Sequence, residues 1–488
     1  MGKNGKKQVA RHLPSALVAA CLFFSACAAE RPFSDVSHVD MPTAVFKAGY
    51  GGIVAKYIEP KTPRELALEG FKGFSDVDSA LRVKAQGTLL RLSRDNRLLR
   101  VGVEPAVDNV DGWAMLSADF LAVALANQPS RQDQDEDAFM TAMFDHILGS
   151  LDEYSRYAGT QLALRQREKR KGYSGAGLQV HDFEDAILVT DVIPESPANK
   201  AGIRPSDAIL EINGVPITGL EIEEVFERLR GPVSSRLDLL LRRPGAAKPF
   251  EVTLYREHVF APTVLYKRRD SIAYIQVSGF NRDTARSLAR HVQEVRKISE
   301  RPLRGIVLDL RGNPGGLMDQ AIAVADLFLE SNGIIYTRGR HPNSSQTYAA
   351  ASGDISEGLP IVILLNGKSA SSAEIVAAAL QKRHRALVIG SRSYGKGTVQ
   401  TVIPLPNGAE ITLTWSLLYT PSGDPLNEVG VRPDICTANL DGKAANLLHQ
   451  IAAHERVGER NCPSLDAESP LDLPLAEGLL KDTPLYAS

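Results

Sequence analysis

The sequence predicts a multidomain α/β protein, of the α+β type, on three observations. First, its 488 residues, 43% of them hydrophobic and 23% charged, are enough for about two to four domains with sizeable cores. Second, a short apolar strand at 306–310 runs through a glycine-rich turn into an amphipathic helix. Third, residues 172–256 form a separate pattern rich in strands.

The composition also excludes some classes of function. A net charge of −2 gives no sign of affinity for nucleic acid. The ten histidines are scattered, and neither a Cys-x-x-Cys pair nor a His-Glu-x-x-His motif occurs, so a zinc protease is not indicated. We therefore predict neither a bound metal nor a cofactor.

The first 28 residues are predicted to be a signal peptide. Four cations precede an apolar run from Leu13 to Ala26, which is too short for a comfortable membrane span. These cations are Lys3, Lys6, Lys7 and Arg11. Two kinds of processing fit the segment: cleavage after Ala28 or Ala29, or a lipoprotein-type signal in which a lipidated Cys27 anchors the protein to the membrane. Either implies export.

Between the predicted signal peptide and residue 172, the sequence shows three local patterns. None of them indicates a role for this region. Residues 88–103 predict a hairpin and residues 113–126 a helix, while 129–137 have the composition of a polar linker.

Residues 172–256 predict a small peptide-binding domain. Strands are expected at 186–193 and 236–243, a short helix at 195–203, a strand pair turning at Asn213-Gly214 within 208–217, and an amphipathic helix at 219–232. Such a sheet accepts an extended peptide beside its edge strand, while loop amides hold a terminal carboxylate. The loop that leads into the first strand supplies the candidates for this contact: Gly175, Ala176, Gly177 and Leu178.

The next motif is the turn RGNPGG at 311–316, which follows the apolar strand. Glycines at a strand-to-helix turn let backbone amides approach a ligand closely. We expect the amide of Gly315 or Gly316, together with that of Ser372, to stabilise an oxyanion. Many α/β connections share this pattern, so the prediction depends on the serine motif that follows.

Ser371 and Lys396, 25 residues apart, predict the chemistry. Ser371 precedes an apolar helix, whose free amides and positive dipole end favour the negative charge of a tetrahedral oxyanion. Lys396 lies in a glycine-flanked turn and can accept the serine's proton only if burial lowers its pKa. Each motif alone also fits an ordinary structural role. The serine motif fits a helix cap in which Glu374 completes a capping box, and the lysine motif fits an ordinary turn.

Together these motifs resemble the carboxyl-terminal processing proteases, also called tail-specific proteases, over roughly residues 138–435. The order of a PDZ-like region, then LRGNPGG (310–316), SASSAE (369–374) and YGKGTVQ (394–400), is highly specific. The resemblance implies a Ser/Lys peptidase with a crotonase-like or ClpP-like βα core, Ser371 as nucleophile, Lys396 as general base and Gln400 as the residue that orients the lysine. One departure is SASSAE in place of the common SASASE, which makes Ser371 and Ser372 neighbours.

The resemblance also implies domains and partners. The expected regions are a signal peptide (1–28), a mainly helical region with a hairpin insert (40–171), a PDZ domain (172–256), a protease core (257–435) and a C-terminal extension (436–488). The helical lead-in to the PDZ domain is expected at 147–159. Substrates are proteins with exposed C-terminal tails; an adaptor protein and a homo-oligomer are compatible with the sequence.

Two further alternatives concern the extension and the activity. Cys436 and Cys462 either form a disulfide in an oxidising periplasm, tying the extension to the last core strand, or remain two free thiols. A non-catalytic PDZ scaffold is the main rival function, although the joint presence of Ser371, Lys396 and Gln400 argues against it. A crotonase-type acyl-CoA enzyme is a remote one, since it would need neither an export signal nor a PDZ insert.

Overall fold

The computed structural model describes residues 40–128, 135–183, 186–298, 302–351, 353–453 and 461–482. The described residues from Met41 onward belong to one unit by their contacts. The predicted signal peptide and Cys27 lie outside the described residues. Within the described ranges, no helix combines the length and the apolar character needed to cross a membrane.

Helices build most of the N-terminal region around a core of large aromatic side chains. Their bounds are α1 Met41–Lys56, α2 Pro63–Gly70, η1 Phe71–Gly73, α3 Phe74–Val77, α4 Val110–Ala126 and α5 Asp135–Gly149. The fully buried aromatic residues include Phe46, Tyr50, Phe74, Trp113, Phe120 and Phe144. The helix predicted at 113–126 is confirmed as α4. The linker prediction is wrong for Asp135–Asp137, which begin α5.

Along the chain, a three-stranded antiparallel sheet follows α3 and precedes α4. Its strand order is β1-β2-β3. The hairpin predicted at 88–103 is confirmed by β2 (Leu89–Arg94) and β3 (Arg97–Val103). Asp95 and Asn96 turn it with φ of 47° and 65°, a conformation that short polar side chains tolerate. Strand β1 (Leu81–Gln86) was not predicted.

The expected helical lead-in at 147–159 is wrong for most of its length, because α5 ends at Gly149 and residues 156–158 form β4 (Arg156–Ala158). The helix before the peptide-binding domain is instead α6 (Thr160–Lys171). It ends at Gly172, whose φ of 74° favours glycine.

The domain that follows holds a sheet in the order β11-β10-β8-β7-β6, with β9 paired to β8. Its elements are β6 Leu178–Phe183, β7 Ala186–Val192, α7 Pro197–Lys200, β8 Ala208–Ile212, β9 Val215–Pro216, α8 Ile222–Leu229, β10 Arg236–Arg242 and β11 Phe250–Tyr255. The turn at Asn213-Gly214 has positive φ at both residues, as predicted. The short pair β5 (Tyr173–Gly175) and β12 (Glu257–Val259) lies where the chain enters and leaves the domain.

The central sheet of the C-terminal half has the order β13-β14-β15-β18-β19-β22, and β14 to β22 run parallel. Its strands are β13 Val264–Arg269, β14 Ile272–Val277, β15 Gly305–Asp309, β18 Ile361–Leu365, β19 Leu387–Gly390 and β22 Ile435–Cys436. Strand β15 is buried throughout, as expected for a parallel strand covered on both faces.

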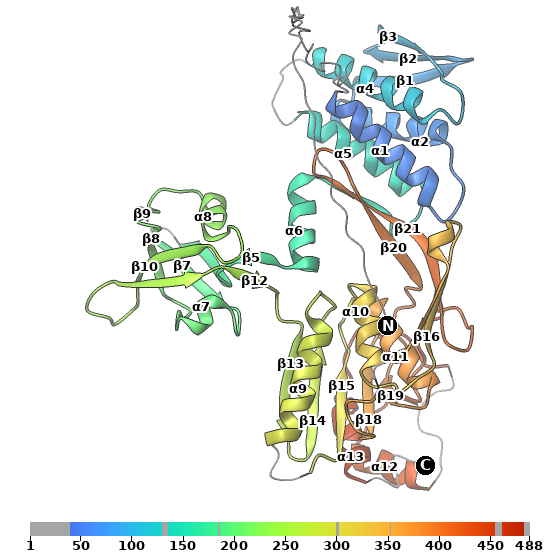
Figure 1. The fold of residues 1–488 in the computed structure, drawn as a ribbon. Coiled ribbons are helices and arrows are strands. Elements are labelled where there is room, and N and C mark those ends of the chain that lie inside the picture. Colours follow the sequence, from blue (N-terminus) through green and yellow to red (C-terminus); the bar gives the residue numbers. More distant parts are fainter. Residues whose placement is uncertain are drawn as a thin grey trace, which may run out of the picture. The chain divides into compact units, whose positions relative to one another are not determined.

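Helices cover both faces of this sheet (Figure 1). On one face Ile306 and Leu308 pack with α9 (Thr284–Ile298), α10 (Met318–Asp326) and α11 (Ser372–Lys382). On the other face Val307 packs with α12 (Ala444–Ala452) and α13 (Asp472–Lys481). The C-terminal extension is therefore part of the core that supports the sheet.

A second sheet has the order β17-β16-β21-β20, with β4 paired to β21. Its strands are β16 Gly333–Arg338, β17 Gln346–Ala349, β20 Thr398–Pro404 and β21 Glu410–Tyr419, and the short helix η2 spans Pro342–Ser344. Ile403, Ile411 and Leu413 of β20 and β21 join the aromatic core of the N-terminal helices. This sheet therefore connects the N-terminal region to the turn that carries Lys396.

Candidate active site

Ser371 lies between the loop that follows β18 and the first residue of α11. Its φ of 53° is rare for a residue that is not glycine, and such strain is concentrated at functional sites. Its side chain is partly exposed, whereas Ser372 is 1% exposed and donates its hydroxyl to Gly316 O at 3.1 Å. Of the two neighbouring serines, only Ser371 presents its side chain to solvent.

Glu374 joins the serine's loop to the lysine's loop. This fully buried carboxylate accepts the backbone amides of Ser371 at 2.7 Å and of Lys396 at 2.9 Å. It also accepts the Gly395 amide at 2.7 Å and the Ser393 hydroxyl at 2.5 Å. Burial raises the pKa of Glu374, and these four hydrogen bonds oppose that rise. One carboxylate therefore fixes the separation of the two backbones.

Replacing Glu374 by glutamine is expected to weaken both activity and stability. The amide has one acceptor oxygen, and its NH₂ group would face donors that the carboxylate now accepts. We expect a loss of about 1–3 kcal/mol in the free energy of unfolding, because buried donors lose their partner. Urea unfolding and kcat/KM would measure both effects. Glu69→Gln, which removes a carboxylate paired with Lys72 on the surface, is the matched control; equal results in the two variants would contradict this role of Glu374.

Lys396 follows Gly395, whose φ of 91° favours glycine. Its ammonium group lies 4.6 Å from the centroid of the Tyr154 ring, which comes from the loop before β4. Burial lowers the pKa of Lys396, and the positive charge of Arg156 lowers it further. Three carboxylates act in the opposite direction: Asp152, Glu153 and Glu374. The balance favours a lysine that loses its proton more readily than usual.

Gln400 contacts neighbouring threonines rather than the lysine. Its side-chain amide donates to Thr398 Oγ1 at 2.8 Å and to Thr414 Oγ1 at 3.4 Å. Thr414 in turn donates to Asp152 at 3.0 Å. Among the residues described, no hydrogen bond joins Gln400 to Lys396. Gln400 is thus connected, through Thr414, to the loop that carries Tyr154.

The turn 311–316 contacts the start of α11, the arrangement that an oxyanion site would need. A Cβ atom built at Gly315 would lie 3.0 Å from the Cβ of Ser371, so only glycine fits this approach without displacement. The Gly315 amide donates to Asn313 Oδ1 at 2.8 Å. The amides of Gly316 and Ser372 have no hydrogen-bond partner in the described part of the chain. Gly316 and Ser372 are therefore better placed than Gly315 to bind an oxyanion.

The predicted tail-binding loop lines a groove of about 450 Å³ between β6 and α8. Ala176, Gly177 and Leu178 contribute to it, and Gly177 has a φ of 81°. Gly175 does not line the groove, because it pairs with Glu257 between β5 and β12. Apolar side chains form much of the remaining wall: Tyr173, Val180, Phe226 and Leu229. The groove suits an extended segment with an apolar side chain.

Arg230 connects this groove to α6. Its guanidinium lies 2.9 Å from Glu168 and 5.7 Å from the centroid of the Tyr173 ring. Two further arginines of α6, Arg167 and Arg170, pair with Glu410 of β21. Separate ion pairs therefore join α6 to the groove on one side and to the sheet that carries Gln400 on the other.

Two features of the site were not visible in the sequence. Glu374 was visible only as a helix-capping residue, and nothing near Tyr154 or Arg156 indicated that folding places them beside a lysine about 240 residues away. Within the described ranges, no three side chains of His, Cys, Asp or Glu gather in a way that would hold a metal ion.

The chain resembles known proteins over most of these regions. Residues 271–437 match peptidase family S41, and residues 188–243 match the PDZ domain. The chain is 39% identical over 303 residues to the carboxy-terminal-processing protease of Bartonella bacilliformis, covering 62% of this chain and 70% of that protein. It is 33% identical over 307 residues to the carboxy-terminal processing protease CtpA of Bacillus subtilis, covering 62% and 65%. The solved photosystem II D1 C-terminal processing protease aligns over 82% of this chain and 93% of its own, with a TM-score of 0.40 and 23% identity.

Proposed function

Because the chain belongs to peptidase family S41, and is a serine peptidase of the carboxy-terminal processing group that recognises protein tails, we propose that Ser371 is its nucleophile and Lys396 its general base. The observation that carries this assignment is the pair of hydrogen bonds by which the buried Glu374 holds the backbones of both residues. The partial exposure of Ser371 and the burial of Ser372 support Ser371 as the nucleophile of the two.

The proposed reaction passes through an acyl-enzyme. Neutral Lys396 takes the hydroxyl proton of Ser371 as its oxygen attacks the scissile carbonyl carbon. The amides of Gly316 and Ser372 receive the developing oxyanion at the positive end of α11. Lys396 then returns the proton to the leaving amine, and water, activated in the same way, releases the acyl group. Gln400 acts indirectly, by fixing Thr414 and the loop that carries Tyr154 over the amine.

The groove between β6 and α8 is the proposed binding site for the substrate tail. Backbone groups of β6 pair with the extended tail, and the loop amides around Gly177 and Leu178 hold its terminal carboxylate. The apolar wall favours an apolar last residue. The domain limits 172–256 and 257–435 are proposed as those of the PDZ domain and the protease core.

Export to the periplasm is part of the proposal. It rests on the sequence pattern of residues 1–28 and on the disulfide between Cys436 and Cys462, a bond typical of oxidising compartments. A lipid on Cys27, an adaptor protein and a homo-oligomer are further proposals that belong to the same cellular setting.

Cleavage of an unfolded reporter with an apolar C-terminal tail tests the tail-directed activity. We expect kcat/KM to fall at least about tenfold when the same tail is amidated, because the loop amides then lose a charge-assisted partner. The reporter with an internal Asp→Asn change, which alters charge by the same amount away from the tail, is the control. Equal cleavage of free and amidated tails would contradict carboxylate recognition. Binding without cleavage would favour the non-catalytic scaffold.

A further inference from the structure

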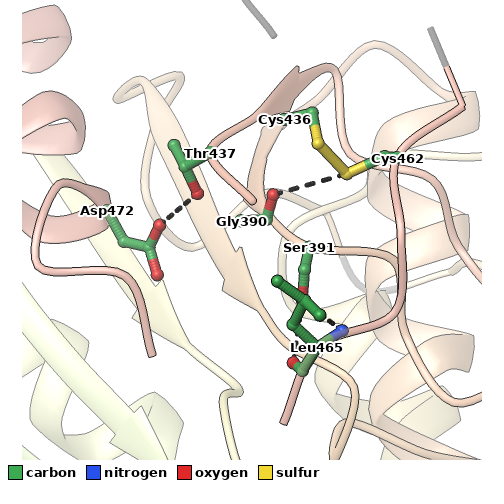
Figure 2. The surroundings of a disulfide bond; sticks show 7 residues. All are labelled: Gly390, Ser391, Cys436, Thr437, Cys462, Leu465 and Asp472. Atoms are coloured by element: carbon green, nitrogen blue, oxygen red, sulfur yellow. Dashed lines mark hydrogen bonds between the residues drawn. A yellow bond between two sulfur atoms is a disulfide. The ribbon is translucent and has the colours of Figure 1, made fainter. Parts of the chain in front are cut away.

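Glu374 is not the only contact that holds the loops of Ser371 and Lys396 together. Cys436, at the end of β22, is joined to Cys462 by a disulfide with a Cα–Cα distance of 5.8 Å (Figure 2). Both cysteines are more than nine-tenths buried. The residues that follow, 462–466, we call the brace segment.

The brace segment contacts the loop that leads to Ser371. The Gly367 amide donates to Leu465 O at 2.7 Å, and the Asn366 side-chain amide donates to Asp466 O at 3.0 Å. A Cβ atom at Gly367 would lie 2.9 Å from the backbone of Leu465, so the two backbones are in close contact. Asn366 also accepts the Gly312 amide at 2.9 Å, which extends this connection to the oxyanion turn.

The same segment contacts the loop that leads to Lys396. The Ser391 hydroxyl donates to Leu465 O at 3.0 Å and lies 3.3 Å from the Leu465 amide that donates to it (Figure 2). The Arg392 amide donates to Pro463 O at 3.0 Å. Cys462 Sγ itself lies 3.8 Å from Gly390 O. The carbonyl of Leu465 is therefore shared by the loop before Ser371 and the loop before Lys396.

We propose that the brace segment, held by the Cys436–Cys462 disulfide, is a positioning element that sets Ser371 relative to Lys396, so that full catalytic rate requires the intact bond. This inference rests on the proposed roles of these two residues. Glu374 holds the two loops at Ser371 and Lys396 themselves. The brace segment holds them farther upstream, at Gly367, four residues before Ser371, and at Ser391, five residues before Lys396. Misplacing reacting groups by about 1 Å costs up to about a hundredfold in rate.

Reduction of the bond is the direct test, on the full-length wild-type protein. A small dithiol attacks one sulfur as its thiolate, which releases the other cysteine and leaves a mixed disulfide on the attacked one; the second thiol of the reagent then releases the attacked cysteine. Two electrons and two protons pass to Cys436 and Cys462 while the reagent closes to its own disulfide. Because both cysteines are buried, incubation continues until alkylation and mass measurement find both as thiols.

We expect kcat on the tail reporter to fall about tenfold on reduction, with KM changed less than about twofold, since the groove is formed by other residues. The pH midpoint of single-turnover acylation should rise, because a displaced Lys396 becomes more hydrated. Reoxidation should restore both values. The double variant Cys436→Ser/Cys462→Ser is the matched control: it should resemble the reduced enzyme and not respond to the dithiol.

Ser391→Ala provides a second variant that keeps the disulfide but removes the hydroxyl bonded to Leu465. It should lower kcat by less than full reduction does. Unchanged kcat and pH midpoint in fully reduced enzyme would overturn the proposal. Loss of both tail binding and kcat in a reduced enzyme whose melting temperature lies below the assay temperature would also overturn it. Reduction would then act through global unfolding alone. Cleavage by Ser371→Ala, with the Cys436–Cys462 disulfide either oxidised or reduced, would show instead that the proposed roles of Ser371 and Lys396 are wrong.

Discussion

Ser371→Ala is expected to abolish tail cleavage, with kcat lowered by roughly 10⁴-fold or more, as for the removal of other serine nucleophiles. The covalent intermediate cannot form without the hydroxyl. The fold should be retained, because the backbone amide that donates to Glu374 remains and the side chain is only partly buried. Binding of a tail peptide should be unchanged, since the groove between β6 and α8 is not altered.

Ser372→Ala is the control for this assignment. It removes a hydroxyl donated to Gly316 O, and keeps the backbone amide that we place in the oxyanion site. We expect less than about a tenfold loss of kcat, in line with about 0.5–1.5 kcal/mol for one hydrogen bond. The reverse ranking, with Ser371→Ala active and Ser372→Ala inactive, would transfer the nucleophile to the neighbouring serine. Mass measurement of the acylated residue would settle either case.

The sequence was sufficient for the parts of this site that depend on local patterns. A strand, a glycine turn and a helix start each have a signature within a few residues, which is why the turn at 311–316, Ser371 and Lys396 could be proposed from the sequence. The groove loop was identified in the same way, except that Gly175 is used for the β5–β12 pair. The family resemblance added the order of these motifs and the role assigned to Gln400.

The contacts that join distant segments could not be predicted. Tyr154 lies over Lys396 because β4 pairs with β21, which in turn pairs with β20. The hydrophobic periodicity of a sequence does not indicate which strands far apart in the chain pair with each other. The extension 436–488 is a second case: its helices α12 and α13 complete the core on one face of the central sheet. Their apolar residues were visible, but the surface that they cover was not.

Lys396→Met is expected to lower kcat by about 10²–10⁴-fold, the range for loss of a general base, while wild-type acylation rises with pH. Burial and Arg156 lower the pKa of Lys396 below its ordinary value, so the neutral amine that the reaction needs accumulates as pH rises through that lowered pKa. Between this pKa and the ordinary value of 10.5 the unfolded chain binds more protons, so stability should also rise with pH in this window.

Lys396→Arg separates the role of the proton from that of the positive charge. Arginine keeps the cation beside Tyr154 but is not deprotonated in proteins, so it should be as inactive as Lys396→Met if the residue is a base. If a fixed positive charge were sufficient, the arginine variant would retain activity. Single-turnover acylation from pH 5 to pH 9 completes the test: the wild type should show a rising limb, and the rise in stability with pH should be lost in Lys396→Met. A flat acylation profile, or an active arginine variant, would exclude Lys396 as the general base and leave it as an electrostatic contact to the oxyanion or the substrate.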